Sequence, residues 1–373
     1  GNTVLIVEHD PDVIKEGDYI IDMGPGSGKN GGEITFEGTY NELLSSNTST
    51  GNALRNKHNL KENIREANHF YNIGPVTQNN LNNVKTSIPK HVLTVLTGVA
   101  GSGKSTLVKA GFENNDHTIF IDQKAVQGSN RSNLLTYLGV FDSVRSYFSK
   151  ETGLNKAMFS YNSKGACPNC GGKGYIKTEL AFMGDFSQTC EVCHGKRYKQ
   201  EVLDATIDGY SIADVLNLTV DEGIIFFDKK NDIKSKLQSV SKTGLNYMSL
   251  GQPLSTLSGG EIQRVKLGQH LDEEIKNSIF IFDEPTTGLH ESDIPILMEC
   301  FDDLIDQNNT VILIEHNLSI MCEADWIIDV GPGPGLDGGK VQFSGTPKNF
   351  IDSSETLTSK HLKRYIKQLS LIH

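Results

Sequence analysis

The chain has 373 residues, with 35 Lys and Arg against 46 Asp and Glu and a formal net charge of −11. This acidic balance argues against a protein that coats nucleic acid over its whole surface, but it is compatible with a local basic patch. It contains no apolar run of about 18 residues or more and no basic segment leading into an apolar stretch at its start, so the sequence predicts neither a membrane-spanning helix nor a secretory signal. Six cysteines, four of them in CxxC pairs, favour reduced thiols and metal over a disulfide framework, as expected of a soluble cytoplasmic protein with two or three domains.

The N-terminal segment is one copy of an internal repeat. Residues 2–39 align without a gap with residues 309–346, and about half of the aligned positions are identical. NTVLIVEHD matches NTVILIEHN, and DYIIDMGPGSGKNGGE matches DWIIDVGPGPGLDGGK. The second copy follows a glycine-rich loop that lies about 200 residues upstream, whereas the first copy has no such loop before it. We therefore expect residues 1–45 to be the tail of a first, truncated copy of the domain that the second repeat closes; a stray duplicated hairpin is the alternative.

The next segment is polar. Residues 45–70 are rich in Ser, Asn and Lys and poor in apolar periodicity. This composition predicts a linker, placed at residues 46–72, with a short helix near residues 60–68.

From Val92 onward, short apolar strands alternate with helical sequence. VLTVLTG runs into the glycine-rich loop, a helix is expected from Lys104 to Gly111, and further buried strands are expected at residues 118–122, 279–283 and 310–315. This alternation predicts an α/β domain of the P-loop type. We place that domain at residues 73–111 and 251–350, with an inserted domain at residues 112–250 and a C-terminal tail at residues 351–373.

The glycine-rich loop carries a phosphate-binding motif. GVAGSGKS, from Gly98 to Ser105, fits GxxxxGK[ST], in which glycines let backbone N–H groups and a helix N-terminus face the phosphates of ATP. Lys104 is expected to reach the β- and γ-phosphates and Ser105 to hold Mg²⁺. A lone match to so short a pattern is often false, but this one follows a strand and has three partner motifs. The predicted ATP-binding residues of this loop are Gly98, Gly101, Ser102, Gly103, Lys104, Ser105 and Thr106.

The partner motifs supply the catalytic groups. IFIFDEP ends a buried strand with two acids; Asp283 is placed to support Mg²⁺ and Glu284 to polarise the attacking water. Two acids at a strand end are also common on any surface, but four apolar residues precede these. His316, after the strand TVILIE, is the predicted sensor of the γ-phosphate. Gln123, after TIFID, is predicted to link Mg²⁺ to the inserted domain.

A signature motif completes the nucleotide machinery. LSTLSGGEIQRVKLG would present the hydroxyl of Ser258 and the backbone N–H groups of Gly259 and Gly260 to a γ-phosphate at a helix N-terminus. These motifs together indicate an ATP-binding cassette. In this class of ATPase the signature completes the site of an opposing cassette, so we expect the chain to bind Mg·ATP and to hydrolyse it slowly by itself.

Two cysteine pairs lie between the phosphate loop and the signature. CPNC and CEVC give CxxC-x19-CxxC, with Cys167, Cys170, Cys190 and Cys193 as ligands. Each pair can form one edge of a Zn²⁺ tetrahedron, and the neighbouring glycines suit the tight turns that such pairs require. A thioredoxin-like redox motif would not explain two matched pairs. The sequence therefore predicts a structural zinc module at residues 165–200.

The zinc module is locally basic. Residues 164–199 contain three acids and six basic residues, a surplus of +3 in an acidic chain. The basic residues are Lys164, Lys173, Lys177, Lys196, Arg197 and Lys199. They could meet a phosphate backbone; a solvated surface or a protein contact fits the charge as well.

Taken together, these motifs resemble the C-terminal half of the UvrA family, the damage-sensing ATPases of bacterial nucleotide excision repair. GVAGSGKST is similar to the second phosphate loop of that family and KGACPNCGGKGYIKTELAF to its zinc module, and SLGQPLSTLSGGEIQRVKL, DEPTTGLH and IEHNLSIMCEADWIIDVGPG complete the match. The resemblance implies an ABC ATPase with an inserted helical and zinc-binding domain. It also implies a DNA-repair protein, usually a homodimer, that binds double-stranded DNA with ATP, Mg²⁺ and Zn²⁺. In that family a UvrB-type partner binds through the N-terminal half, and the ATPase is not itself the nuclease.

Three departures from the family pattern bear on damage recognition. About 16 residues separate Ser105 from Asp122, FMGDFSQ stands where the family has a Leu-Pro-Asp run, and NRSNL does not end in proline. They favour a divergent paralogue of the kind associated with resistance to DNA-binding drugs as an alternative function. A transporter ATPase is a further alternative, which shares the ATP motifs but gives no reason for the zinc module.

Overall fold

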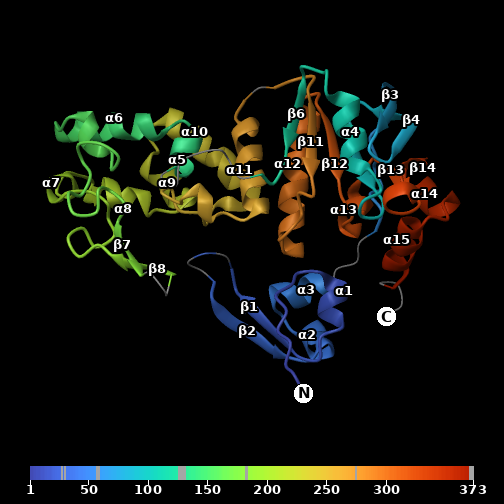
Figure 1. Ribbon diagram of the computed structural model, residues 1–373, viewed down its shortest axis with the longest axis horizontal. Helices are drawn as coiled ribbons and strands as arrows, with labels where there is room; N and C mark the ends of the chain where they lie inside the picture. The colour runs from blue at the N-terminus through green and yellow to red at the C-terminus, as the bar shows by residue number, and fades with distance from the viewer. Residues whose placement is uncertain are drawn as a thin grey trace. The chain divides into compact units, whose positions relative to one another are not determined.

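The computed structural model describes residues 1–26, 28, 31–55, 59–124, 132–180, 184–273 and 275–368 (Figure 1). The chain forms two compact units, one of residues 1–124 and 258–373 and the other of residues 125–257. Within the described residues, no helix combines the length and the apolar character needed to cross a membrane.

A six-stranded sheet forms the centre of the first unit, in the order β14-β13-β5-β12-β11-β6. The five strands from β13 to β6 are parallel, and β14 pairs antiparallel with β13 at one edge. The expected buried strands are all present, so the predicted α/β P-loop fold is confirmed, with an antiparallel edge strand added. The bounds are β5 Leu93–Thr97, β6 Thr118–Ile121, β11 Ile279–Asp283, β12 Thr310–Ile314, β13 Trp326–Gly331 and β14 Lys340–Gly345.

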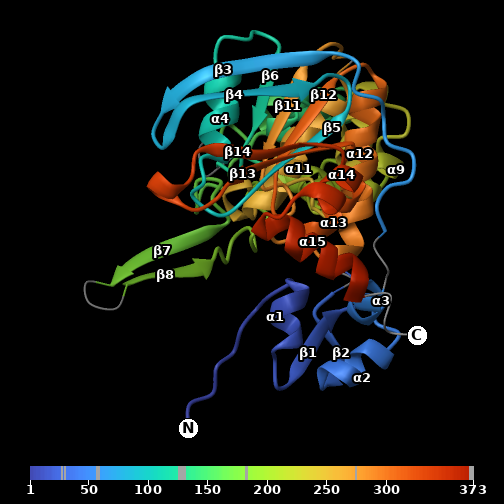
Figure 2. The ribbon, with the colours of Figure 1, turned by 90° about the vertical axis from the view of Figure 1, so that its right-hand side faces the viewer.

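Both faces of this sheet are covered, which explains its continuous apolar strands. Along β12, Val311 and Leu313 belong to one apolar cluster and Ile312 and Ile314 to the other, because successive side chains point to opposite faces. The first cluster includes helices α11 (Gly259–Leu271), α12 (Ile294–Asp306), α13 (Leu318–Glu323), α14 (Pro347–Ser353) and α15 (Leu357–Gln368). The second includes helix α4 (Lys104–Phe112) and the hairpin β3 (Phe70–Gln78) and β4 (Leu81–Pro89), the long blue ribbon in Figure 2.

The predicted C-terminal tail is largely helical. Leu362 of α15 is fully buried in the first apolar cluster, and the hydroxyl of Tyr365 lies 2.8 Å from that of Ser319. No helix was predicted here, although Leu362 and Tyr365 lie three positions apart on one helix face; packing against α13 and α14 stabilises it. Residues 369–373 lie outside the described residues.

The linker differs from its prediction. A helix occupies Ser49–Arg55, as α3, and residues 59–68, where a helix was expected, contain none. The backbone and the charged side chains of this segment instead bind to distant parts of the chain. Lys61 N donates to Cys322 O at 2.8 Å. The Arg65 guanidinium donates to Asp302 and Asp306 at 2.7 and 2.9 Å. These contacts hold the segment in an irregular, non-helical conformation. Residues 56–58 of the linker lie outside the described residues.

The N-terminal repeat folds like its second copy. Helix α1 (Pro11–Lys15), strands β1 (Ile20–Gly24) and β2 (Glu33–Gly38) and helix α2 (Tyr40–Ser45) correspond to α13, β13, β14 and α14. The two hairpins have the same register, with the same irregularity after Asp22 and after Asp329. The segment before the hairpin differs: Val4, Leu5, Ile6 and Val7 are 64–87% exposed and form no strand, whereas their counterparts in β12 are buried.

The second unit consists mainly of short helices and two hairpins. Its interior contains aromatic side chains in contact, such as Phe148 with Phe159 in a tilted arrangement and Tyr161 with Tyr198 edge to face. The bounds are α5 Leu134–Tyr137, α6 Phe141–Thr152, β7 Tyr175–Leu180, β8 Gly184–Thr189, α7 Gln200–Leu203, β9 Thr206–Ile207, β10 Tyr210–Ser211, α8 Ile212–Leu216, α9 Val220–Phe226 and α10 Asn231–Val240.

The extent of the second unit differs from the predicted insertion. Strand β6 lies inside the range 112–250 but pairs with β11 in the main sheet, and the compact unit runs from residue 125 to 257. The start of the element NRSNL, residues 130–131, and part of FMGDFSQ, residues 182–183, lie outside the described residues.

Candidate functional site

The carboxyl ends of four parallel strands bring the predicted nucleotide residues to one edge of the sheet. Gly98 follows β5, Gln123 closely follows β6, Asp283 ends β11, and His316 closely follows β12. Neighbouring parallel strands end at the same edge, which is where open α/β sheets bind ligands. Residues separated by up to about 200 positions in the sequence are thus placed together.

The phosphate loop needs its first glycine for steric reasons. Gly98 has φ +132°, and a Cβ atom there would lie 2.0 Å from the carbonyl oxygen of Val330 on β13. The loop therefore passes directly against β13, and any side chain at position 98 would force the two apart. Gly103, with φ +102°, is the N-cap of α4, so the N-terminus of that helix opens toward the loop, as anion binding requires.

Lys104 turns back over the loop. Its Nζ donates to the carbonyl oxygens of Gly98 at 2.8 Å and Val99 at 3.0 Å. Burial lowers the pKa of Lys104, an effect that nearby acids including Glu284 and Asp329 oppose. A partly desolvated ammonium at the phosphate loop is suited to bind phosphate oxygens.

Two oxygen groups that could hold Mg²⁺ come together across the site. Ser105 Oγ donates to Asp283 Oδ1 at 3.3 Å, and the other carboxylate oxygen lies 3.6 Å from Nζ of Lys109. Hydroxyl and carboxylate oxygens are the ligand types that Mg²⁺ accepts alongside phosphate. The donor set thus fits the metal that the sequence predicts.

Glu284 and Gln123 lie beside this pair. Glu284 has φ +52°, a conformation that costs a non-glycine residue about 1–2 kcal/mol and is often found at functional sites. Its backbone is fixed on both sides: Glu284 N donates to Ile314 O at 2.9 Å, and Gln123 Nε2 donates to Glu284 O at 3.1 Å. The Glu284 side chain is exposed and therefore open to a substrate.

The signature forms a capped helix start. Ser258 is the N-cap of α11; its Oγ accepts from Glu261 N at 3.3 Å, and Glu261 Oε2 accepts from Ser258 N at 2.8 Å. Both glycines after it are tightly packed, since a Cβ on Gly259 would lie 2.9 Å from Gln123 Oε1 and one on Gly260 2.6 Å from Thr287 O. The signature thus lies against the loops that follow β6 and β11.

The remaining predicted residues surround the same edge. His316 is exposed, and its backbone N–H donates to Glu315. Thr106 Oγ1 accepts from Asn79 Nδ2 at 3.2 Å. Ser102 is fully buried in the loop, and its hydroxyl has no hydrogen-bond partner among the described residues. An orphaned hydroxyl inside a phosphate loop fits a site that a ligand completes.

Several residues that hold the site together were not predicted from the sequence. Asn80 Nδ2 donates to Gly101 O at 3.3 Å and Gly335 O at 3.1 Å, and Gly339 N donates to Ser102 O at 2.9 Å. The turn between β3 and β4 and the glycine-rich loop after β13 therefore both support the phosphate loop. That second loop was visible in the sequence only as part of the repeat.

Helix α11 also fixes the strand ends. Gln263 Nε2 donates to Asp283 O at 2.6 Å and Ile121 O at 3.3 Å, and Lys266 Nζ donates to Asp122 O at 2.9 Å. The two residues are three positions apart and share one helix face. That spacing within the signature is the signal that could have identified them.

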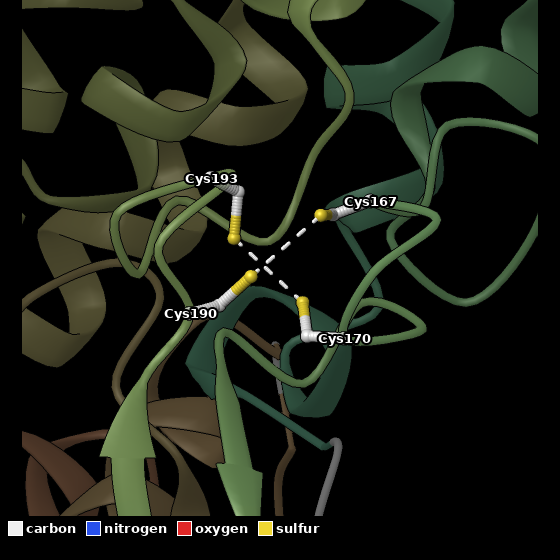
Figure 3. Close-up of side chains that lie close together, drawn as sticks. All are labelled: Cys167, Cys170, Cys190 and Cys193. Carbon is white, nitrogen blue, oxygen red and sulfur yellow. Dashed lines mark hydrogen bonds between the residues drawn. The ribbon is translucent and has the colours of Figure 1, made fainter.

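The four cysteines of the second unit converge on one point (Figure 3). Their sulfur atoms all lie within 4.8 Å of one another, with Cys167 to Cys190 at 3.9 Å and Cys170 to Cys193 at 3.7 Å. Four sulfurs bound to one Zn²⁺ at about 2.3 Å would be about 3.8 Å apart. The cluster therefore fits a four-thiolate zinc site, as the spacing predicted.

Hydrogen bonds to sulfur support this reading. Gly174 N donates to Cys170 Sγ at 3.2 Å, and Asn169 Nδ2 donates to Cys190 Sγ at 3.3 Å. The bond from Asn169 lowers the pKa of Cys190 to about 6, whereas burial raises the pKa of Cys193 to about 12. Donors aimed at sulfur favour thiolates, the form that binds metal.

The cysteine loops continue into the hairpin β7–β8, which leaves the cluster as two paired strands (Figure 3). Of the predicted basic residues, Lys164, Lys173, Lys177 and Lys196 are exposed. Lys196 and Lys199 form ion pairs with Asp214 and Glu201, and Arg197 lies over the ring of Tyr161 at 5.2 Å. Arg197 and Lys199 are only partly exposed, so they contribute less to the basic surface than the other four residues.

Comparison with known proteins gives consistent results. The family model described as ABC transporter matches residues 81–287. UvrABC system protein A of Clostridium perfringens is 43% identical over 98% of this chain and 43% of its own length. The same protein of Aquifex aeolicus is 41% identical over 100% and 44%, respectively. The chain thus spans less than half the length of these curated relatives.

A solved structure agrees. The crystal structure of UvrA2 from Deinococcus radiodurans superposes with a TM-score of 0.91 at 38% identity, covering 98% of this chain and 48% of that one. The aligned region covers nearly the whole chain and therefore includes residues of both compact units.

Proposed function

The chain belongs to the UvrA family of ABC ATPases, and from that membership we propose that it is an ATP-dependent DNA-binding protein of the nucleotide excision repair type. In this proposal ATP hydrolysis is coupled to the recognition of damaged duplex DNA. The observation that carries it is the joint occurrence of a complete set of nucleotide residues on one sheet edge and a four-cysteine cluster in the other unit.

The residues at the sheet edge divide the work of phosphoryl transfer. Lys104 and the loop N–H groups would bind the phosphates, and Ser105 and Asp283 would hold Mg²⁺, which supplies charge neutralisation when bound. Glu284 would accept a proton from water, and His316 would contact the γ-phosphate. Gln123 and Gln263 would hold the ends of β6 and β11 in place relative to each other. Ser258, Gly259 and Gly260 would serve an opposing cassette, so slow hydrolysis by the isolated chain is expected.

The second unit supplies the proposed route to DNA. Cys167, Cys170, Cys190 and Cys193 would hold Zn²⁺, which fixes the base of the hairpin β7–β8. The exposed ammonium groups of Lys164, Lys173 and Lys177 would contact phosphates and orient the protein on the duplex. A transporter ATPase has no use for such a module, which favours DNA over a membrane solute.

The N-terminal repeat is proposed to complete another cassette. Its residues Val4 to Val7 are exposed, and so are Ile21 and Met23, whose counterparts Ile328 and Val330 are buried. An apolar surface of this kind in a soluble chain marks an interaction site. We propose that it packs on the core of a first cassette, and that the complete protein forms a homodimer and binds a UvrB-type partner.

Fluorescence anisotropy with labelled duplexes tests the DNA proposal. We expect zinc-loaded chain to bind duplex DNA, with binding to a lesion-containing duplex changed by ATP relative to ADP. The variant Lys173→Glu/Lys177→Glu should weaken binding about tenfold and reduce the salt dependence. Lys150→Glu, an exposed charge on α6, is the matched control. Binding to neither intact nor damaged duplex by zinc-loaded chain would contradict the proposal.

A further inference from the structure

A single buried carboxylate joins two loops of the nucleotide site. Glu315 follows the end of β12 and is 1% exposed. Its Oε1 accepts from the backbone N–H of Thr286 at 3.0 Å and from the Thr286 hydroxyl. Its Oε2 accepts from the backbone N–H groups of His316 at 2.8 Å and Asn317 at 3.0 Å.

Four donors on one carboxylate form a strong connection. Burying a charge is unfavourable unless hydrogen bonds compensate it, and bonds to a charged acceptor are about twice as strong as neutral ones. Each oxygen of Glu315 serves one loop: Oε1 binds the loop after β11, and Oε2 binds the loop after β12. Removing the carboxylate would leave N–H groups of both loops without their acceptor.

The two loops carry the groups that act on the γ-phosphate. Glu284 lies two residues before Thr286, and His316 is itself one of the four donors. Glu284 is also bound to β12 through Ile314 O, and its φ of +52° needs surrounding contacts to be maintained. The position of Glu284 relative to His316 therefore depends on the end of β12.

We propose that Glu315 is a positioning residue that holds Glu284 and His316 in one arrangement around the γ-phosphate. This inference rests on the proposed ATPase function and adds to it a residue that touches neither nucleotide nor Mg²⁺. It acts only through the two loops that it joins.

The test compares a nucleotide that has a γ-phosphate with one that does not. Affinities of the 373-residue chain for ADP and for the slowly hydrolysed analogue ATPγS are measured with Mg²⁺ by displacement of a fluorescent ADP. Glu315→Gln keeps the size of the side chain but replaces one acceptor oxygen by a donor. Thr286→Val keeps the shape and removes only the hydroxyl, and His316→Ala reports the loss of the γ-phosphate contact itself.

We expect Glu315→Gln and His316→Ala each to lower the preference for ATPγS over ADP about tenfold, while ADP affinity stays within about twofold. Thr286→Val should show a smaller loss of the same kind. Glu315→Gln combined with His316→Ala should be no worse than either alone, because residues that act through one contact are not additive. Bound ATP should be cleaved at least about tenfold more slowly in Glu315→Gln.

A purely structural role gives a different result. In that case Glu315→Gln lowers the melting temperature but leaves the ATPγS preference within about twofold of the parent at a temperature where both are folded, and the inference is wrong. A loss of ADP affinity as large as the loss of ATPγS affinity would also overturn it. Glu299→Gln, an exposed carboxylate on α12, controls for the amide change. A parent chain that binds neither nucleotide contradicts the proposed function instead.

Discussion

Ser105 Oγ lies 3.3 Å from Asp283 Oδ1, although 178 positions separate the two residues in the chain. The contact joins the start of helix α4 to the end of strand β11. It unites the phosphate loop, which predicts nucleotide binding, with the strand that carries the candidate base Glu284. Both oxygens belong to the ligand types that Mg²⁺ accepts.

This pair predicts a magnesium-dependent affinity. Asp283→Asn should reduce the affinity for ATP in the presence of Mg²⁺ about tenfold or more, because a neutral amide oxygen binds the cation less strongly than a carboxylate. Affinity measured with EDTA should change less than about twofold. Isothermal titration with and without Mg²⁺ checks this, and an equal loss under both conditions would show that Asp283 supports the loop rather than the metal.

The pKa of Lys104 predicts how nucleotide affinity depends on pH. Burial lowers this pKa from its usual 10.5, so the ammonium loses its proton at a lower pH than an exposed lysine. The charged form binds phosphate, and ATP affinity should therefore fall as pH rises through the lowered pKa. The free chain should show the opposite trend in stability: the unfolded chain binds more protons in this window, so the free energy of unfolding rises with pH until the usual pKa.

Displacement of fluorescent ADP by ATP, measured between about pH 7 and 10, reports the effect. Lys104→Arg remains charged throughout this range and should show a much flatter profile, even where its affinity at pH 7 is lower. Parallel declines in the two proteins would assign the pH dependence to another group.

Zinc removal should act locally on the second unit. Cys170→Ser, or treatment with a strong chelator, should reduce bound zinc from about one ion per chain to near zero and expose the hairpin β7–β8 to protease. ATP affinity should stay within about twofold, because the nucleotide residues lie in the other unit. Elemental analysis and limited proteolysis provide the measurement. Cys300→Ser, at a cysteine buried in the main core, should keep its zinc; loss of zinc there would contradict the assignment of ligands.

How far the sequence could predict the structure depended on whether the signal was local. Strands such as Ile279–Asp283 are buried on both faces and are therefore apolar throughout, a pattern that is visible without any partner. The cysteine spacing is likewise a local signal, because each CxxC pair can by itself form one edge of a Zn²⁺ tetrahedron. The helix expected near residues 60–68 was wrong because Arg65 binds Asp302 and Asp306, and acids so distant in sequence leave no local trace.

The same limit applies to the site. Gly98, Lys104 and Asp283 belong to motifs that are read within a few residues. Glu315 was noticed only as part of a repeated element, because its contacts with Thr286 exist only once β11 and β12 lie side by side. Asn80 was missed for the same reason, since its turn contacts a loop more than two hundred residues later.

The internal repeat gives a matched pair of substitutions for the exposed N-terminal segment. Leu5 is 85% exposed, and its counterpart Ile312 in β12 is fully buried. Ile312→Glu places an unpaired charge in the core and should lower the free energy of unfolding by about 4 kcal/mol or more. Leu5→Glu should change it by no more than about 0.5 kcal/mol, as at other exposed positions. Denaturant unfolding of both variants makes the comparison.

The same Leu5→Glu change should reduce self-association of the chain. Val4 to Val7 form an exposed apolar run with high β propensity, which is prone to pair with other strands. A charge in its middle opposes such pairing without affecting the folded units, so sedimentation at increasing concentration should show less association for the variant. If Leu5→Glu instead destabilised the chain as strongly as Ile312→Glu, residues 2–8 would be packed in solution and the repeat would need no further core to cover it.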